Sequence, residues 1–324
     1  MQSVETYREA FVKYLENQSP VKEPKNLYEP IEYILNLGGK RLRPVLTLMA
    51  SDMFGGEYQK ALPAAMAVEV FHNFSLVHDD IMDDAPLRRG KKTVHEKWDI
   101  NTGILSGDAM LINAYQFLEA YEGESLTQLF ALFSKTAIEV CEGQQYDVDF
   151  ENRTDVTLPE YLKMIEFKTS VLVAAALKMG AIVAGASVAN QDLIYEFGRN
   201  LGLAFQLQDD YLDAFGDPKT FGKQVGGDII ENKKTFLYLK ALELGAGEDT
   251  KTLLELYQGN TKDSATKVAL VKEIFERSGS KAATEDEVEN YTNRAFESLL
   301  KIDAAEEAKQ VFKAFAAQLM NRES

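Results

Sequence analysis

Two clusters of aspartate residues are the part of this sequence best suited to chemistry. DDIMD occupies residues 79–83 and DDYLD occupies residues 209–213, and each follows an apolar segment with the pattern of a buried helix. Within each cluster two carboxylates lie four residues apart, on one helix face, where like charges repel. A solvated acidic surface would explain one such cluster. The repetition favours binding of a hard divalent cation such as Mg²⁺, whose ligand shell is commonly completed by substrate phosphates.

Lysine and arginine gather near the first cluster and after the second. The segments GGKRLRP at 38–44 and RRGKK at 88–92 carry three and four cations, and the loop 216–228 is rich in glycine and lysine. Arginine binds phosphate through two parallel hydrogen bonds, and helix N-termini add amide donors. Carboxylates, cations and apolar helices together predict a cavity for a ligand with a diphosphate head and an apolar tail.

Helical periodicity covers nearly every long segment that must position these residues. Alternating strand patterns with hairpin turns are essentially absent, and no Pro/Ser linker divides the chain. Although the length would allow two domains, we predict one all-α domain over residues 1–324 with ten or more helices. The expected helices span residues 3–17, 28–37, 44–54, 58–82, 98–121, 125–148, 158–188, 190–215, 232–244, 249–257, 264–277 and 284–319.

Composition excludes several classes of partner. The 324 residues carry a formal charge of −16, which disfavours nucleic acid and anionic membrane surfaces. The single cysteine, Cys141, rules out an internal disulfide and suggests a reducing compartment.

The apolar segment 171–189 is nearly long enough to cross a bilayer. Because Lys178 interrupts it and small residues predominate, we expect a buried helix in a soluble, cytoplasmic protein.

The motifs as a set resemble those of the short-chain trans-isoprenyl diphosphate synthases, the farnesyl/geranylgeranyl diphosphate synthase family of polyprenyl synthetases. The similarity extends over nearly the whole chain. It is carried by GGKRLRP, HDDIMDDAPLRRGKKTVH, ILSGDAML, GQQYDVDF, KTS, FQLQDDYLDAFGD and FGKQVGGDIIENKKT, in that order. The resemblance implies an all-α fold around a deep central cavity and a homodimer.

The resemblance also implies roles for individual residues. Metal binding would fall to Asp79, Asp83 and Asp209, with Asp80, Asp210 and Asp213 as supporting catalytic carboxylates. The allylic diphosphate would be held by Arg88, Lys168, Thr169, Gln206, Lys223 and Lys233. Isopentenyl diphosphate would be held by Lys40, Arg43, His72 and Arg89. Gln144 and Asp147 match the family's GQxxD motif and would line the cavity.

The implied reaction is a Mg²⁺-dependent condensation of isopentenyl diphosphate with dimethylallyl, geranyl or farnesyl diphosphate, using about three Mg²⁺ ions with substrate bound. The allylic C–O bond ionises, the isopentenyl double bond attacks the carbocation, and the released diphosphate takes the proton. In related synthases the fifth and fourth positions before the first aspartate motif form the cavity floor. Phe74, with Phe71 below it and the small Ser75 beside it, therefore predicts farnesyl or geranylgeranyl diphosphate as product, with a preference for the latter.

Three other protein classes share parts of this pattern. A class I terpene cyclase pairs an aspartate motif with Mg²⁺, but it needs no second diphosphate site such as the one that the resemblance assigns to Lys40, Arg43 and Arg89. An all-α metal phosphohydrolase needs histidines from separate helices, whereas His72 and His78 lie on one expected helix. A noncatalytic partner subunit or prenyl-binding module would be expected to lack one aspartate motif. The synthase interpretation is therefore favoured.

Overall fold

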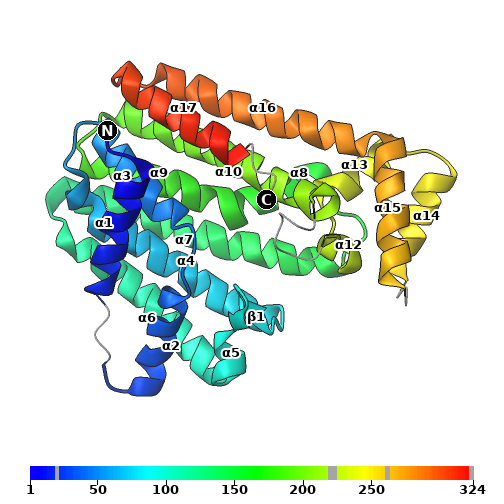
Figure 1. The fold of residues 1–324 in the computed structure, drawn as a ribbon, viewed down its shortest axis with the longest axis horizontal. Coiled ribbons are helices and arrows are strands. Elements are labelled where there is room, and N and C mark those ends of the chain that lie inside the picture. Colours follow the sequence, from blue (N-terminus) through cyan, green and yellow to red (C-terminus); the bar gives the residue numbers. More distant parts are fainter. Residues whose placement is uncertain (19–21, 218–224, 260–262, 321–324) are drawn as a thin grey trace. The chain divides into compact units, whose positions relative to one another are not determined.

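The computed structural model describes residues 1–18, 22–217, 225–259 and 263–320, and nearly all of this chain is helical (Figure 1). More than ten helices and one small hairpin make up these ranges. The prediction of an all-α fold with ten or more helices is confirmed. Within the same ranges, none of the helices combines the length and the apolar character that a membrane crossing requires.

The described chain groups into two compact units. Unit 1 comprises residues 1–137, 175–195 and 303–305, and unit 2 comprises residues 138–174, 196–302 and 306–324. Helices α7 (Gly123–Asn152), α9 (Val171–Val183) and α10 (Val188–Phe215) contribute to both units. A single domain around a central cavity stays a prediction.

Each unit has its own set of shorter elements. Unit 1 contains α1 (Val4–Glu16), α2 (Lys25–Asn36), α3 (Leu42–Met53), η1 (Tyr58–Ala61), α4 (Leu62–Met82), β1 (Leu87–Arg88), β2 (Lys91–Lys92), α5 (Val94–Lys97), α6 (Ile100–Gln116) and η2 (Phe117–Ala120). Unit 2 contains α8 (Leu158–Ile165), the π turn η3 (Glu166–Ser170), α12 (Gly227–Ile230), α13 (Phe236–Leu244), α14 (Glu248–Gln258), α15 (Ser264–Ser278), α16 (Ser280–Lys301) and α17 (Glu306–Met320).

Helix α4 is the centre of unit 1, and α6 packs closely along it. Two glycines of α6 allow this approach at the end of α4 that carries the first aspartate motif. A Cβ atom on Gly107 would overlap the His78 ring, and one on Gly103 would lie 2.8 Å from Ile81 Cδ1. Interiors at this packing density leave no room for the added methyl group, so the two glycines set where α4 ends relative to α6.

The hairpin corrects one prediction, because we expected strand pairs to be essentially absent. β1 pairs antiparallel with β2, and the connecting residues Arg89 and Gly90 have φ of 53° and 72°. Two positive φ values in a two-residue connection are the geometry of a type I′ turn. Strands of two residues are too short to show alternation in a sequence, and Arg-Gly is not the usual Asn-Gly signal, so the pattern was missed.

Two predicted helix boundaries were also wrong. The predicted helix 284–319 is divided into α16 and α17, because Ile302 turns into the core at 1% exposure and the Asp303 N–H donates to Asn190 Oδ1 at 3.0 Å. The predicted helix 232–244 begins only at Phe236, because residues 233–235 are not helical and Thr235 is extended. Both breaks depend on contacts with residues distant in sequence, which local periodicity does not report.

Candidate active site

The first aspartate motif lies at the C-terminal end of α4. Asp83 caps the helix, with its backbone N–H donating to Asp79 O at 2.8 Å, so the two carboxylates begin one helical turn apart. Asp79 is half-buried and Asp83 is exposed. The C-terminus of a helix is the negative end of its dipole. Additional carboxylates are therefore unfavourable there unless a cation binds.

Asp80 has a different environment from its two neighbours. Its side chain is 1% exposed and accepts hydrogen bonds from Arg88 Nε at 2.8 Å and from Arg88 Nη2 at 2.6 Å. This bidentate pair ties the end of α4 to the hairpin. Arg88 Nη1 makes no hydrogen bond to any residue that the structure describes, so one face of the guanidinium can still reach a ligand.

A group of arginines surrounds His72 on α4. Arg43 Nη1 lies 3.3 Å from His72 Nε2. Burial, and then the positive charges of Arg43, Arg89, Arg88 and Arg41, lower the pKa of His72 well below its ordinary value, so the ring is neutral at neutral pH. Burial also lowers the pKa of Arg43, whose buried Nε has no hydrogen-bond partner in the described chain. A buried cation with an unsatisfied donor is a site for an anion.

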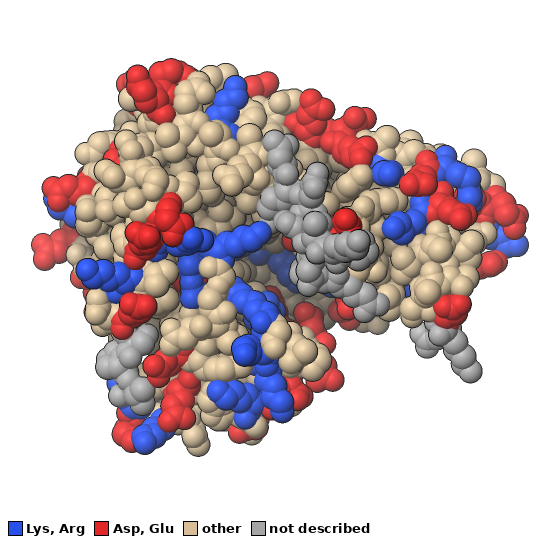
Figure 2. Space-filling view, in the orientation of Figure 1, with Lys and Arg blue, Asp and Glu red and all other residues tan. Residues whose placement is uncertain are grey.

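The glycine loop of GGKRLRP meets the hairpin in unit 1. Arg89, although exposed, donates from Nη1 to Gly38 O, and a Cβ atom on Gly39 would lie 2.9 Å from Arg89 Cζ. The two basic segments are therefore together in space, as the sequence predicts. Lys40 is exposed at the same loop. Figure 2 shows Lys and Arg side chains gathered over the part of unit 1 where Figure 1 places α2 and the hairpin.

Arg41 differs from Lys40 and Arg43, although it lies between them in GGKRLRP. Its guanidinium is 7% exposed, forms an ion pair with Glu69 and donates to Leu35 O. Its φ of 50° is unusual for a residue other than glycine. The role of Arg41 is therefore to hold the loop that presents Lys40 and Arg43.

In the second aspartate motif, in unit 2, the second aspartate is again buried and bound by protein side chains. Asp210 is 7% exposed and accepts hydrogen bonds from the Tyr161 hydroxyl and from Gln206 Nε2, the latter at 2.9 Å. Burial, followed by the charge of Asp228, raises the pKa of Asp210 well above its ordinary value. Thr169 Oγ1 in turn donates to Gln206 Oε1 at 3.2 Å. Tyr161, which the sequence analysis missed, therefore begins a chain of hydrogen bonds that ends at Thr169.

A π turn presents the KTS motif, because η3 interrupts the long helix predicted over 158–188. Single π turns in helices are frequent at functional sites. Gly143 on α7 lies against this turn, and a Cβ atom there would overlap the Lys168 backbone nitrogen. One turn farther along α7, Asp147 Oδ2 accepts from Lys168 Nζ at 2.5 Å. GQxxD and KTS are therefore brought together, with Gln144 half-buried on the same helix.

Asp213 and Lys233 meet at α12. The Asp228 N–H donates to Asp213 Oδ2 at 3.0 Å, and Lys233 Nζ lies 3.7 Å from Asp228 Oδ1 and 3.1 Å from Glu231 Oε2. Burial alone would lower the pKa of Lys233, but Asp228 and Glu231 raise it above its ordinary value, so the amine stays charged. The predicted ligand Lys223 lies outside the described residues.

The carboxylate set fits Mg²⁺ only in part. Among the described residues, no group of three or more His, Cys, Asp or Glu side chains could hold a metal ion. Arg88 binds Asp80, and Tyr161 and Gln206 bind Asp210, so these aspartates are committed to protein contacts. Mg²⁺ is commonly bound through only one or two carboxylates, and it usually keeps water and takes substrate phosphates as its other ligands.

The residues predicted to set product length lie in an aromatic cluster. The Phe74 ring centroid lies 5.4 Å from that of Phe71 and 4.8 Å from that of His78, and Phe71 also contacts Phe133 of α7 at 5.4 Å. Ser75 is half-buried, and its hydroxyl donates to His72 O at 2.9 Å. Phe133, which was not predicted from the sequence, extends this aromatic cluster beyond Phe71.

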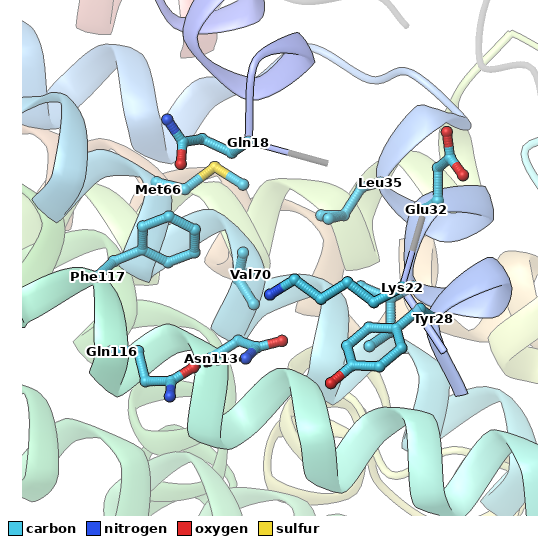
Figure 3. A pocket seen from close by; sticks show the side chains of 11 residues that line it. Gln18, Lys22, Tyr28, Glu32, Leu35, Met66, Val70, Asn113, Gln116 and Phe117 are labelled. Carbon is cyan, nitrogen blue, oxygen red and sulfur yellow. Dashed lines mark hydrogen bonds between the residues drawn. The ribbon is translucent and has the colours of Figure 1, made fainter. Parts of the chain in front are cut away.

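A pocket of about 350 Å³ opens on a different part of unit 1, between the end of α1 and helices α2, α4 and α6 (Figure 3). Apolar residues of α2 and α4 line its base, and polar side chains surround its rim. Its lining comprises Gln18, Lys22, Tyr28, Ile31, Glu32, Leu35, Met66, Val70, Asn113, Gln116 and Phe117. None of the predicted site residues is among them, so we assign this pocket no part in the reaction.

Comparison with known proteins agrees with this arrangement. A family model described as polyprenyl synthetase matches residues 24–275. The geranylgeranyl diphosphate synthase of Methanosarcina mazei is 44% identical over 232 residues, which cover 71% of this chain and 72% of the relative. The geranylfarnesyl diphosphate synthase of Natronomonas pharaonis is 40% identical over 256 residues, covering 74% and 75%. A crystal structure of a geranylgeranyl pyrophosphate synthase matches 100% of both chains with 55% identity and a TM-score of 0.96.

Proposed function

The chain belongs to the polyprenyl synthetase family, and we propose that it condenses isopentenyl diphosphate with an allylic diphosphate in a Mg²⁺-dependent reaction. It is a prenyl diphosphate synthase, and therefore a transferase. The observation that carries the detailed proposal is the arginine group around His72. Neither Arg43 nor Arg89 forms an ion pair in the described chain, although the charge of Glu69 acts on both, and both act on His72, which lies on the helix that carries the first aspartate motif.

Isopentenyl diphosphate is the substrate that the arginine group suits. Arg43, Arg89 and neutral His72 offer several hydrogen-bond donors and positive charge without any metal ligand among them. Arginine forks bind diphosphate oxygens in pairs. Lys40, exposed at the adjacent loop, can add a further cation. We assign these four residues to isopentenyl diphosphate.

The allylic diphosphate is assigned to the aspartate motifs and to the cations near them. Asp79 and Asp83 in unit 1, and Asp209 in unit 2, are the carboxylates that we propose as Mg²⁺ ligands. Mg²⁺, when bound, would supply positive charge that stabilises the departing diphosphate. Arg88, Lys168, Thr169, Gln206 and Lys233 would hold and orient the diphosphate, and apolar side chains keep water from the allylic cation. We expect the released diphosphate to take the proton.

The direct test is incubation of the protein with Mg²⁺, isopentenyl diphosphate and each allylic primer, followed by chromatography of the dephosphorylated products. A synthase consumes both substrates and gives linear prenyl alcohols. A terpene cyclase would instead convert the allylic diphosphate alone into a cyclic hydrocarbon. A noncatalytic subunit would convert neither.

Substitutions at two neighbouring positions of α4 should change product length in opposite directions. We propose that Phe74 limits the chain, because its ring packs on Phe71 and His78 on the helix that carries Asp79. Phe74→Ala should shift products toward longer chains, and adding Phe71→Ala should extend them further, at a cost of about 3–5 kcal/mol in stability because Phe71 is fully buried. Ser75→Phe should shorten them. An unchanged product distribution in active Phe74→Ala and Ser75→Phe variants would contradict this assignment.

We also propose a homodimer formed through α6 and the N-terminal half of α7. Leu105, Ile112 and Phe130 are 60%, 60% and 53% exposed, and the Tyr115 ring of α6 contacts Phe130 of α7. Large apolar side chains exposed together mark an interaction surface. Leu105→Glu with Ile112→Glu should convert the dimer to a monomer in light scattering. Leu300→Glu, at a leucine of matched exposure (63%) on α16, should leave it a dimer. A wild-type monomer would refute the proposal.

A further inference from the structure

Lys267 on α15 is a buried lysine that no carboxylate in the described chain pairs with. It is 3% exposed, and its Nζ donates to Asn232 Oδ1 at 2.5 Å and to Ile230 O at 3.4 Å. The Tyr257 ring centroid lies 5.2 Å from the same amine. Burying a charged amine costs free energy unless specific contacts offset it. The two oxygen contacts therefore indicate which part of the chain Lys267 stabilises.

Both contacts fall on one turn, between α12 and Lys233. Ile230 is the last residue of α12, and Asn232 has φ of 60°, a left-handed conformation that asparagine adopts more readily than most residues other than glycine. The Lys233 N–H then returns to Asp228 O at 2.9 Å. From the other side, Lys234 Nζ donates to Glu151 O at 2.8 Å. Lys267 and Lys234 therefore both help to fix this turn, whereas the Lys233 side chain stays 47% exposed.

We propose that Lys267 is a positioning residue, which fixes the Asn232 turn so that Lys233, which lies 3.7 Å from Asp228, keeps the geometry needed to bind the allylic diphosphate. The proposal rests on the proposed function, because the role of Lys233 comes from it. Because the Lys267 amine is bound to Asn232 Oδ1 and Ile230 O, we expect it to contact neither substrate directly. Its effect must therefore appear as a change in allylic binding.

Lys267→Met tests this, with Lys272→Met on the same helix as the matched control. Lys272 contacts the Phe215 ring instead, with Nζ 5.4 Å from its centroid. Lys267→Met should raise the KM for the allylic diphosphate about tenfold, the loss typical when a residue that orients a ligand is removed. The KM for isopentenyl diphosphate should stay within about twofold. Methionine fills a similar space and removes a buried charge, which offsets part of the cost of leaving Asn232 Oδ1 and Ile230 O without this donor, so thermal stability should change little.

Hydrogen exchange in the substrate-free protein separates this proposal from the proposed function. Amides of residues 228–235 should exchange faster in Lys267→Met and not in Lys272→Met, whether or not the protein makes prenyl diphosphates. Asn232→Gly, which removes the acceptor and tolerates the positive φ, should reproduce the KM effect, and the double variant should add little. Unchanged exchange at 228–235 would overturn the proposal. So would a fall in thermal stability with equal changes in both KM values, because that marks a general role in folding.

Discussion

Asp79→Ala should reduce condensation by roughly 10²–10³-fold or more, the scale of losing a group that stabilises charge in the transition state. Asp79 lies at the C-terminal end of α4, where its negative charge is unfavourable without a cation. Its removal should therefore leave the helical circular dichroism near wild type. The test is to measure product formation over a Mg²⁺ titration. The wild type is compared with Asp79→Ala and with Asp209→Ala in the second motif.

Asp84→Asn is the matched control for the first motif. Asp84 is exposed, directly follows Asp83 and has φ of 48°, which asparagine adopts more readily than most residues. The activity of Asp84→Asn should stay within about twofold of wild type, since Asp84 is exposed and we assign it no ligand. Full activity of Asp79→Ala, or of the wild type in excess chelator, would show that the carboxylates are not metal ligands.

Arg88→Met should lower stability and activity together. It leaves the Asp80 carboxylate buried at 1% exposure without its bidentate partner. Breaking a fully buried ion pair costs about 3–5 kcal/mol. Since the Arg88 side chain is 25% exposed, we expect Arg88→Met to lower the free energy of unfolding by about 2–4 kcal/mol. The midpoint of thermal unfolding should fall by several degrees, and the KM for the allylic diphosphate should rise.

The double variant Asp80→Asn with Arg88→Met separates the two effects. Neutralising Asp80 removes the unpaired charge, so much of the stability should return while the allylic KM stays high. Arg89→Met provides the contrast, because Arg89 is exposed and is assigned to isopentenyl diphosphate. It should hardly change stability and should raise the KM for isopentenyl diphosphate. Equal stability of Arg88→Met and Arg89→Met would contradict the role of the Asp80 pair, and identical KM effects would contradict the substrate assignment.

Much of the fold could be predicted because it depends on local pattern. Apolar residues at helical spacing predicted α4 and α10, and Gly38 and Gly39 end α2 as expected, with φ of 81° and 124°. The hairpin at 87–92 and the break at Ile302 were missed. The first depends on a turn with positive φ at a nonglycine residue, and the second on a hydrogen bond from Asp303 to Asn190. Neither leaves a periodic signal.

Local sequence pattern was enough to predict which residue types would meet a diphosphate, namely two aspartate motifs at helix ends and the basic segments. Which charged side chains are instead bound by other parts of the protein became visible only in the folded chain. Arg41 pairs with Glu69 across 28 residues, Tyr161 with Asp210 across 49, and Lys267 with Asn232 across 35. Helical spacing orders side chains within a few turns of one helix. A buried charge needs a partner wherever the packed chain brings one, and packing brought these partners from other helices and loops.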